Sequence, residues 1–181
     1  PYRTKLESGT VTWESPSNIA LVKYWGKKEH QIPANPSISF TLNNCKTTTT
    51  LTFSKKENTQ QFSFEVFLDG EKKEEFKPKI ETFFKRIESY LPFLTDYHFK
   101  IETSNTFPHS SGIASSASGM SALALCLMSV EKELSAIQDD SEESQKYFNL
   151  KASFLARLGS GSACRSIVGD LIVWGDSTTV E

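Results

Sequence analysis

Serine and glycine are concentrated between residues 110 and 119, where five serines and two glycines occupy seven of the ten positions. The flanking patterns place this stretch between a strand and a helix, so its backbone N–H groups and the positive end of the helix dipole could bind a phosphate. Gly112 and Gly119 allow the backbone to approach a ligand closely, and the hydroxyls of Ser115 and Ser116 add donors. An ordinary loop whose serine caps a helix fits the composition equally well. The stretch lacks the Gly-Lys-Ser/Thr of a Walker loop and the glycine spacing of a dinucleotide fold.

Two lysines follow an apolar run in SPSNIALVKYWGKK, residues 15–28. Lys23 ends the run, where a lysine is unfavourable unless an anion pairs with it, and Lys27 lies in the turn that follows. Both could therefore neutralise an anionic substrate. The competing interpretation, which these residues alone favour, is that Lys23 reaches solvent at a strand end and Lys27 is a solvated loop charge.

Arg165 lies in a third stretch of small residues, GSGSACRS at 159–166. Alternating glycine and serine let a ligand approach the backbone, and a guanidinium can hold a carboxylate or phosphate with two parallel hydrogen bonds. The alternative is a tight helix–helix packing site beside a surface arginine, and the residues themselves favour neither interpretation.

The composition fits one globular domain, because 38% of the 181 residues are hydrophobic and 12% aromatic, enough for one sizeable core. The 20 Lys and Arg residues nearly balance the 22 Asp and Glu, which argues against partners such as nucleic acid or a membrane surface. The longest mostly apolar run, 120–130, is far shorter than the roughly 20 residues that cross a bilayer. Scattered cysteines and histidines without ligand spacing indicate reduced thiols, no protein-held transition metal and a cytoplasmic protein.

Strand patterns dominate the first third of the chain. Residues 10–25 contain two β-rich runs separated at Pro16, and residues 37–44 and 46–54 form two further runs joined by an Asn-Asn-Cys turn. Residues 61–76 alternate polar with apolar side chains up to Asp69-Gly70, a strong hairpin signal.

The periodicity changes to that of a helix from Pro78, which suits a first helical turn. One apolar stripe follows, formed by Ile80, Phe83, Phe84, Ile87 and Leu91. Residues 96–104 return to a strand, helices are predicted at about 116–134 and 142–158, and residues 166–175 close with a strand. This order predicts an α+β fold, a sheet with helices packed on one face.

Three motifs in this order and spacing resemble one family. SPSNIALVKYWGKK, FPHSSGIASSASG and GSGSACRS are similar to the signatures of the mevalonate diphosphate decarboxylases, members of the GHMP small-molecule kinase superfamily, and the resemblance runs from about Thr10 to Trp174. The Pro-x-x-x-Gly-(Leu/Ile)-Ala-Ser-Ser-Ala loop belongs to the whole superfamily, whereas NIALVKYWGK and GSGSACRS are narrower. The resemblance implies a GHMP-kinase-type N-terminal domain, with a mixed β-sheet and a left-handed β-α-β crossover.

The resemblance also implies an ATP- and Mg²⁺-dependent decarboxylase of the mevalonate pathway. It would phosphorylate the 3-hydroxyl of mevalonate 5-diphosphate, then release phosphate and carbon dioxide to give isopentenyl diphosphate. Arg165 would fix the leaving carboxylate and Lys23 would lie beside the reacting hydroxyl. The other implied substrate contacts are Asn18, Tyr24, Lys27, Ser160, Gly161 and Ser162. The implied ATP-binding residues are Pro108, Ser111, Gly112, Ala114, Ser115, Ser116 and Ala117.

In this family the catalytic aspartate comes from a C-terminal half, and neither Asp170 nor Asp176 fits its pattern. Residues 1–181 are therefore expected to be the N-terminal, nucleotide-binding domain of a longer enzyme, inactive alone, with a homodimer among the implied assemblies. Two alternatives stay open, namely a sibling kinase acting on mevalonate or a phosphomevalonate and a non-catalytic nucleotide-binding module. GSGSACR argues against the kinase, because a kinase has no need to hold a carboxylate in a leaving geometry.

Overall fold

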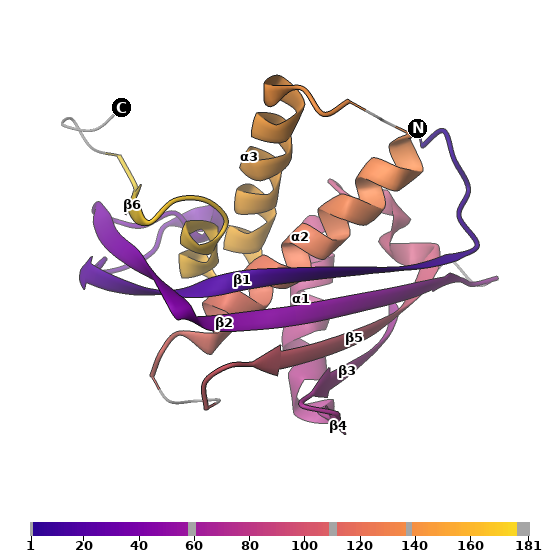
Figure 1. Cartoon of the computed structure of the whole chain (residues 1–181), viewed down its shortest axis with the longest axis horizontal. Helices are drawn as coiled ribbons and strands as arrows, with labels where there is room; N and C mark the ends of the chain where they lie inside the picture. The colour runs from indigo at the N-terminus through magenta and orange to yellow at the C-terminus, as the bar shows by residue number, and fades with distance from the viewer. Residues whose placement is uncertain (1, 58–60, 109–111, 137–138, 177–181) are drawn as a thin grey trace.

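The computed structural model describes residues 2–57, 61–108, 112–136 and 139–176. These residues form one mixed six-stranded sheet in the order β1-β2-β5-β3-β4, with β6 paired to β2, and helices gather on one side of it (Figure 1). The strands are β1 (Ser8–Val22), β2 (Ser37–Lys55), β3 (Ser63–Leu68), β4 (Glu71–Lys72), β5 (Tyr97–Asn105) and β6 (Leu171–Trp174). The α-helices are α1 (Lys77–Ile87), α2 (Ser115–Ser135) and α3 (Glu142–Gly159). The 3₁₀ helices are η1 (Glu29–Gln31), η2 (Glu74–Phe76), η3 (Pro92–Thr95) and η4 (Gly161–Ser166).

The first two strands are long and antiparallel, and they correct two sequence predictions. Pro16 does not separate two runs, because β1 continues through it, and the Asn-Asn-Cys segment is not a turn, because β2 continues through that as well. Pro16 lies opposite Lys46, whereas the next residue, Ser17, lies opposite Leu42. Residues 43–45 are thus extra residues in a β-bulge, and the bulge absorbs the turn-forming asparagines without ending the strand.

The hairpin at Asp69-Gly70 is confirmed. Both residues have positive φ, 51° and 82°, which is the geometry of the two-residue turns that match the twist of paired strands. The turn joins β3 to β4, and α1 then leads to β5, which pairs parallel to β3. This β-α-β unit makes the sheet mixed, as expected, while the left-handed sense of its crossover stays a prediction.

All three predicted α-helices are present; α2 and α3 match within about a residue at each end, whereas α1 ends at Ile87, before the last residue of its predicted stripe. The stripe predicted for α1 is buried from Ile80 to Ile87, and Leu91 just beyond it is also buried. α2 is buried on nearly every side because it packs against β1, β2 and α3. That position explains its almost unbroken run of small and apolar residues, since a helix enclosed all round needs no polar face.

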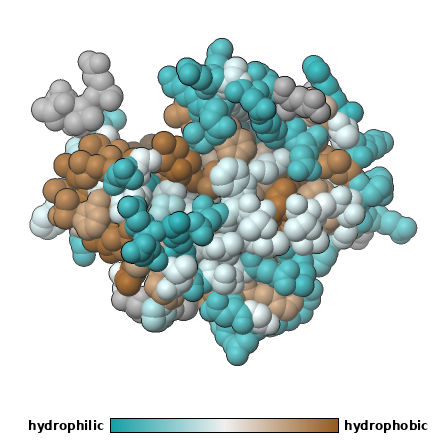
Figure 2. Space-filling view, in the orientation of Figure 1, coloured by the Kyte–Doolittle hydropathy of each residue, from teal (hydrophilic) through white to brown (hydrophobic). Residues whose placement is uncertain are grey.

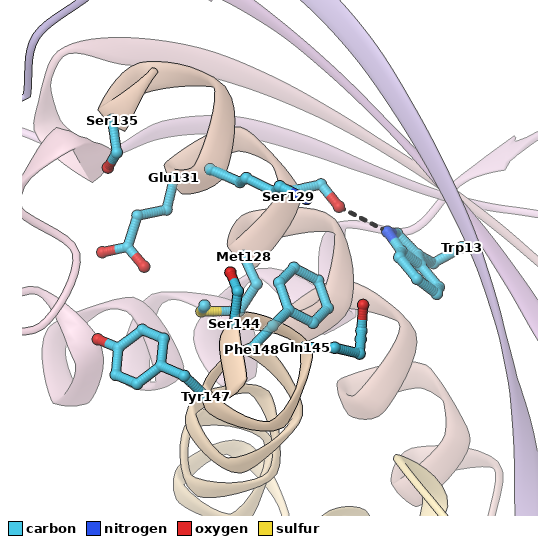
Figure 3. Close-up of a pocket in the computed structure, with 10 residues that line it drawn as sticks. Trp13, Met128, Ser129, Glu131, Ser135, Ser144, Gln145, Tyr147 and Phe148 are labelled. Carbon is cyan, nitrogen blue, oxygen red and sulfur yellow. Dashed lines mark hydrogen bonds between the residues drawn. The ribbon is translucent and has the colours of Figure 1, made fainter. Parts of the chain in front are cut away.

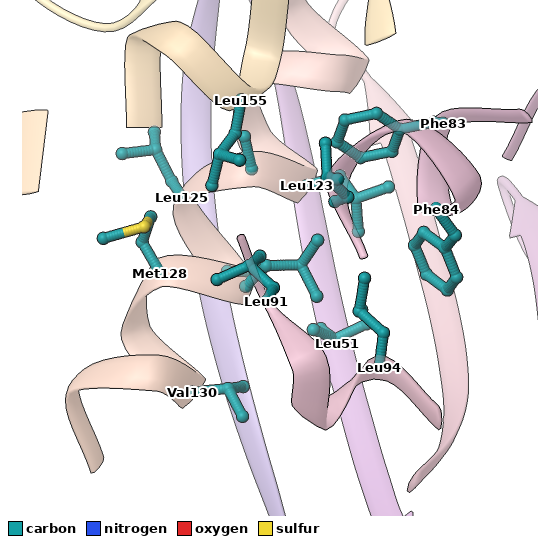
Figure 4. Close-up of a cluster of buried hydrophobic side chains, with 14 of the residues drawn as sticks. Leu51, Phe83, Phe84, Leu91, Leu94, Leu123, Leu125, Met128, Val130 and Leu155 are labelled. Atoms are coloured by element: carbon teal, nitrogen blue, oxygen red, sulfur yellow. The ribbon is translucent and has the colours of Figure 1, made fainter. Parts of the chain in front are cut away.

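The hydrophobic core lies between the sheet and the helices (Figure 4). The fully buried ring of Phe84 on α1 meets the edges of Phe62, Phe64 and Phe99 at centroid distances of 5.6, 5.2 and 5.8 Å. Edge-to-face pairs of this kind add to the free energy gained by burying the rings. On the other face of the sheet, exposed threonine hydroxyls pair across β1 and β2 at Thr12–Thr50, so the helices cover one face, as predicted.

The short strand β6 lies beside the first residues of β2 and confirms the predicted closing strand. Large apolar side chains are exposed near it, among them Val22, Val168 and Leu171, and Figure 2 shows hydrophobic surface gathered on that side of the molecule. Within the described residues, no helix is both long and apolar enough to cross a membrane.

Candidate functional site

The three motifs singled out from the sequence meet in the structure. The hydroxyl of Ser17 on β1 donates to the carbonyl of Ile113 in the loop before α2. The hydroxyl of Ser15 donates to the carbonyl of Ser166 in η4 at 2.8 Å. A single strand therefore ties the serine-rich loop and the arginine-bearing segment to each other, although about 50 residues of sequence lie between them.

Asn18 holds η4 against β1. Its side-chain amide donates to the Ser166 hydroxyl at 2.7 Å and to the Ser162 carbonyl at 3.1 Å, while its Oδ1 has no hydrogen-bond partner among the described residues. Ser17 and Asn18 are adjacent yet both buried, although successive side chains of a regular strand point to opposite faces. The bulge between Pro16 and Ser17 breaks this alternation.

The N-terminus of α2 is open. Its capping position is Ala114, which has a left-handed φ of 53° and no side chain that could accept from the first N–H groups. Ser116 in the first turn is exposed, and a Cβ built on Gly112 or on Gly119 would meet nothing within 4 Å. Among the described residues, the first N–H groups of this long helix, those of Ser115 and Ser116, have no partner and have clear space beside them, which suits an anion.

The residues predicted to bind ATP phosphates thus surround this helix start. Gly112, Ala114, Ser115, Ser116 and Ala117 are brought together there. Pro108 is exposed shortly before the loop, and Ser111 lies outside the described residues. A cavity of about 300 Å³ adjoins the helix start, and its lining includes Thr47, Asn105, Ser115, Ser116 and Gly119.

The substrate motif touches the helix start directly. The hydroxyls of Ser116 and Ser160 are 3.3 Å apart, and the hydroxyl of Ser121 on α2 donates to the carbonyl of Ala163 at 2.6 Å. The serine-rich loop and GSGSACRS are separate stretches in the sequence, but they are neighbours in the structure. A group transferred from one to the other would have a short path.

Arg165 is buried, with only 3% of its surface exposed, and it forms no ion pair within the described residues. Its Nη1 donates to the Ser37 hydroxyl at 2.6 Å, its Cζ lies 5.3 Å from the centre of the Trp174 ring, and its Nε has no partner among the described residues. Burial lowers the pKa of the guanidinium, and Cys164 and Tyr24 oppose that shift. Arginine still keeps its charge under ordinary conditions, so the site holds a buried cation without an anion.

Ser15, Ser17 and Ser37 complete the arrangement and were not predicted. Together with Asn18, Arg165 and Ser166 they are called the polar cluster below, and all six are buried. A signal was present, because SPSN and PSIS place small polar residues within predicted strands. The sequence does not reveal the bulge between β1 and β2, however, so it could not show which of these residues face inwards.

Tyr24, Lys27 and Gly161 lie beside the polar cluster. Lys27 Nζ donates to Gln31 Oε1 at 2.7 Å and lies 5.6 Å from the centre of the Tyr24 ring. A Cβ added to Gly161 would come within 3.0 Å of Lys27 Nζ, so the absence of a side chain at Gly161 lets the lysine lie close to the backbone of η4. The lysine and the backbone of η4 can therefore contact one ligand together.

Lys23 is the site residue that the structure leaves apart. It lies exposed just after the end of β1, and within the described residues its side chain makes no hydrogen bond or ion pair. The predicted strand end is confirmed, and the exposed side chain fits the interpretation that Lys23 reaches solvent there, while its catalytic role stays a prediction.

The metal-ligating residue types do not gather. Within the described ranges, no three His, Cys, Asp or Glu side chains lie close enough to hold an ion. A magnesium ion here would reach the protein through phosphate oxygens, which is a usual mode for this cation.

The comparison with known proteins covers the part of the chain that contains the three motifs. Residues 15–181 match the family described as diphosphomevalonate decarboxylase-like N-terminal domain. The diphosphomevalonate decarboxylase of Bos taurus is 33% identical over 180 residues, covering 91% of this chain and 40% of that protein. The enzyme of Gibberella zeae, ERG19, is 33% identical, covering 94% of this chain and 44% of its own length. The chain thus spans about two fifths of the relatives that it matches.

Solved structures show the same fold. The crystal structure of mevalonate diphosphate decarboxylase from Staphylococcus aureus has a TM-score of 0.71 at 34% identity and covers 93% of this chain and 46% of that one. A structure of the Enterococcus faecalis enzyme, described as showing mevalonate diphosphate mediated ATP binding, has a TM-score of 0.67 at 33% identity, covering 93% and 47%. A structure described as MDDEF in complex with MVAPP, AMPPCP and magnesium gives 0.67 at 33% identity, covering 93% and 46%.

Proposed function

Because the chain belongs to the diphosphomevalonate decarboxylase family, we propose that it forms part of an enzyme that converts mevalonate 5-diphosphate into isopentenyl diphosphate with ATP. The observation that carries this proposal is the buried Arg165, which has no counter-charge in the described residues. A buried cation is costly unless an anion pairs with it, so the site is arranged for an anionic ligand. The substrate carboxylate is that ligand.

The diphosphate of the substrate binds beside the carboxylate subsite. Lys27 and the hydroxyl of Tyr24 contact it, and the backbone and hydroxyls from Ser160 to Ser162 surround it at the start of η4. Lys27 is the mobile element, because its present partner, Gln31, is neutral and an anionic diphosphate binds an ammonium more strongly. Asn18 positions η4 through its two hydrogen bonds.

ATP binds at the open start of α2. The N–H groups and hydroxyls of Ser115 and Ser116 fit its phosphates, and the adjoining cavity of about 300 Å³ fits the rest of the nucleotide. Mg²⁺, when bound with the nucleotide, neutralises phosphate charge. The 3.3 Å between the hydroxyls of Ser116 and Ser160 supports a phosphate donor bound next to the substrate segment.

The reaction then follows in two parts. Phosphoryl transfer to the 3-hydroxyl makes a better leaving group, and Lys23 stabilises charge at the reacting oxygen. Next, the C3–O bond breaks with its electron pair leaving on phosphate, while the bond to the carboxylate carbon breaks, supplies the new C=C pair and releases carbon dioxide. Arg165 orients the carboxylate during this step, and its enclosed position limits attack by water.

Residues 1–181 are proposed to be the N-terminal, nucleotide-binding domain of a two-domain enzyme. The matching family is an N-terminal domain, and the relatives are more than twice as long as this chain. The exposed apolar side chains near β6 suit a contact between two domains. The catalytic aspartate implied by the family resemblance lies in the second domain. A homodimer and a cytoplasmic location are likewise proposed from that resemblance.

The test is carbon dioxide release and ADP formation by the complete enzyme with mevalonate 5-diphosphate and ATP. We expect equal amounts of both products, and Arg165→Gln to lower turnover by about 2–5 kcal/mol in activation free energy while leaving ATP affinity unchanged. Arg157→Gln is the matched control, because Arg157 also packs over a ring, that of Phe154, at 5.4 Å. ADP without carbon dioxide from the unaltered enzyme would indicate the sibling kinase instead.

A further inference from the structure

We propose that Trp174 is a positioning residue for the substrate carboxylate, acting by holding the Arg165 guanidinium against its indole ring. This inference rests on the proposed function, because it concerns the same carboxylate. None of the three motifs of the family includes Trp174, which comes from β6.

Two residues from neighbouring strands contact the guanidinium of Arg165. Trp174 on β6 and Ser37 on β2 are directly paired in the sheet, and Arg165 contacts both of them. The Ser37 hydroxyl accepts from Nη1 at 2.6 Å, and the Trp174 ring centre lies 5.3 Å from Cζ. Because the hydroxyl uses one N–H and the ring uses none, most of the guanidinium donors stay free for a carboxylate.

Trp174 also reaches the diphosphate side of the site. The Tyr24 ring meets it edge-on, with the centroids 5.0 Å apart and the planes at 82°. A Cβ on Gly161 would come within 2.9 Å of the indole. One side chain therefore contacts residues proposed to bind each of the two charged ends of the substrate.

Packing alone does not account for an indole at this position. The Trp174 Nε1 is buried and has no hydrogen-bond partner among the described residues, which is unfavourable compared with a phenylalanine ring. Trp13, at the other end of the sheet, shows the ordinary arrangement, because its Nε1 donates to the Ser129 hydroxyl at 2.7 Å (Figure 3). The broad π face of the indole, which binds cations better than that of other aromatic residues, is what this position gains.

The experiment measures binding of two ligands to the chain by calorimetry. Mevalonate 5-diphosphate carries the carboxylate, and isopentenyl diphosphate lacks it. We expect Trp174→Leu to weaken binding of mevalonate 5-diphosphate about tenfold and that of isopentenyl diphosphate less than about threefold, since the lost cation–π contact acts on the carboxylate subsite. Trp174→Phe, which keeps a ring, should recover most of the loss, and its thermal midpoint should be no lower than that of the unaltered chain.

Trp13→Leu is the matched control. It removes a tryptophan far from Arg165, so it should lower the thermal midpoint without changing the ratio of the two affinities. An unchanged ratio in Trp174→Leu, whatever its stability, would overturn the inference and leave the proposed function standing. If the unaltered chain did not prefer mevalonate 5-diphosphate to isopentenyl diphosphate, the carboxylate role of Arg165 would fail, and the role of Trp174 with it.

Discussion

The hydrophobic core and the polar cluster are both shielded from water, but they differ in what they contain. Phe84 in the core is surrounded by other rings and leaves no polar atom behind. The polar cluster buries a charge and leaves Asn18 Oδ1 and Arg165 Nε without partners among the described residues. The core is complete as it stands, whereas the polar cluster is complete only when a ligand supplies the missing charge and acceptors.

This difference separates stability from function in the molecule. Burial of apolar surface stabilises the fold whether or not a ligand is present. A buried, unpaired guanidinium lowers stability in the free protein and raises the affinity for an anion. Substitutions in the two regions should therefore change stability in opposite directions, and the four predictions below test this difference.

The largest effect is expected in the core. Phe84→Ala removes a fully buried ring and should lower the free energy of unfolding of the chain by about 3–5 kcal/mol. Urea denaturation monitored by circular dichroism measures the change. Thr12→Ala, on the exposed face of the sheet, is the control and should stay within about 0.5 kcal/mol of the unaltered chain. A loss below about 1 kcal/mol for Phe84→Ala would mean that the core is loosely packed.

A smaller effect is expected at the start of α2. Ser116→Ala removes one hydroxyl but keeps the backbone N–H groups and the helix dipole, so transition-state stabilisation with ATP should fall by about 1.5–3 kcal/mol in the complete enzyme. Binding of mevalonate 5-diphosphate should change less. Ser89→Ala, on the surface beyond α1, controls for the loss of a hydroxyl. Unchanged dependence on ATP concentration and turnover would contradict the phosphate-binding role of this loop.

Arg165→Met should act on stability with the opposite sign to Phe84→Ala. Replacing a buried cation by an apolar side chain of similar length should leave the chain as stable as before or more stable by about 1 kcal/mol. Ser37 keeps its bond to the Val22 carbonyl at 2.6 Å, so the substitution leaves no new unpaired donor there. Thermal denaturation of the free chain is the measurement, with Arg157→Met as control. A large drop in stability would make Arg165 a structural residue.

The smallest effect concerns the reactivity of two thiols, one in the core and one beside the polar cluster. Burial raises the pKa of Cys126, in the core, to about 12 and that of Cys164, beside Arg165, to about 11. A raised pKa keeps a thiol neutral near pH 8, so both should react slowly with iodoacetamide and faster as the pH approaches those values. Mass spectrometry of the labelled chain follows each site. Rapid labelling of Cys164 at pH 7 would show that the region around Arg165 opens readily to solvent.

The sequence predicted most of the fold because local patterns carry it. The stripe of α1, the Asp69-Gly70 turn and the strand that became β5 each depend on neighbouring residues only, and the structure contains all three. The predicted break at Pro16 and the predicted turn at Asn43 and Asn44 were wrong for the same reason. Their local preference for turns is outweighed by pairing between β1 and β2, which only the folded chain supplies.

For the site, motif resemblance identified Arg165 and the serine loop but not what surrounds them. Ser37 and Trp174 are 137 positions apart in sequence and become partners only through the pairing of β2 with β6. Asn18 is buried next to Ser17 at the point where the bulge shifts the register between β1 and β2. Contacts set by tertiary pairing have no signature in a single sequence, so they could not be predicted.

The number of residues in the bulge at 43–45 determines which side chains of β2 face the interior on either side of it. On one side of it Leu51 and Phe53 lie buried in the core, and on the other Ser37 and Ser39 are buried, with Ser37 bonded to Arg165. Removing one residue from the bulge would reverse the parity of one side, because each step along a strand changes the face. The half of β2 that packs in the core would keep its orientation, so the change of face would affect the half that contains Ser37. A deletion of one residue that touches no ligand would thus erase the binding site while the fold survives.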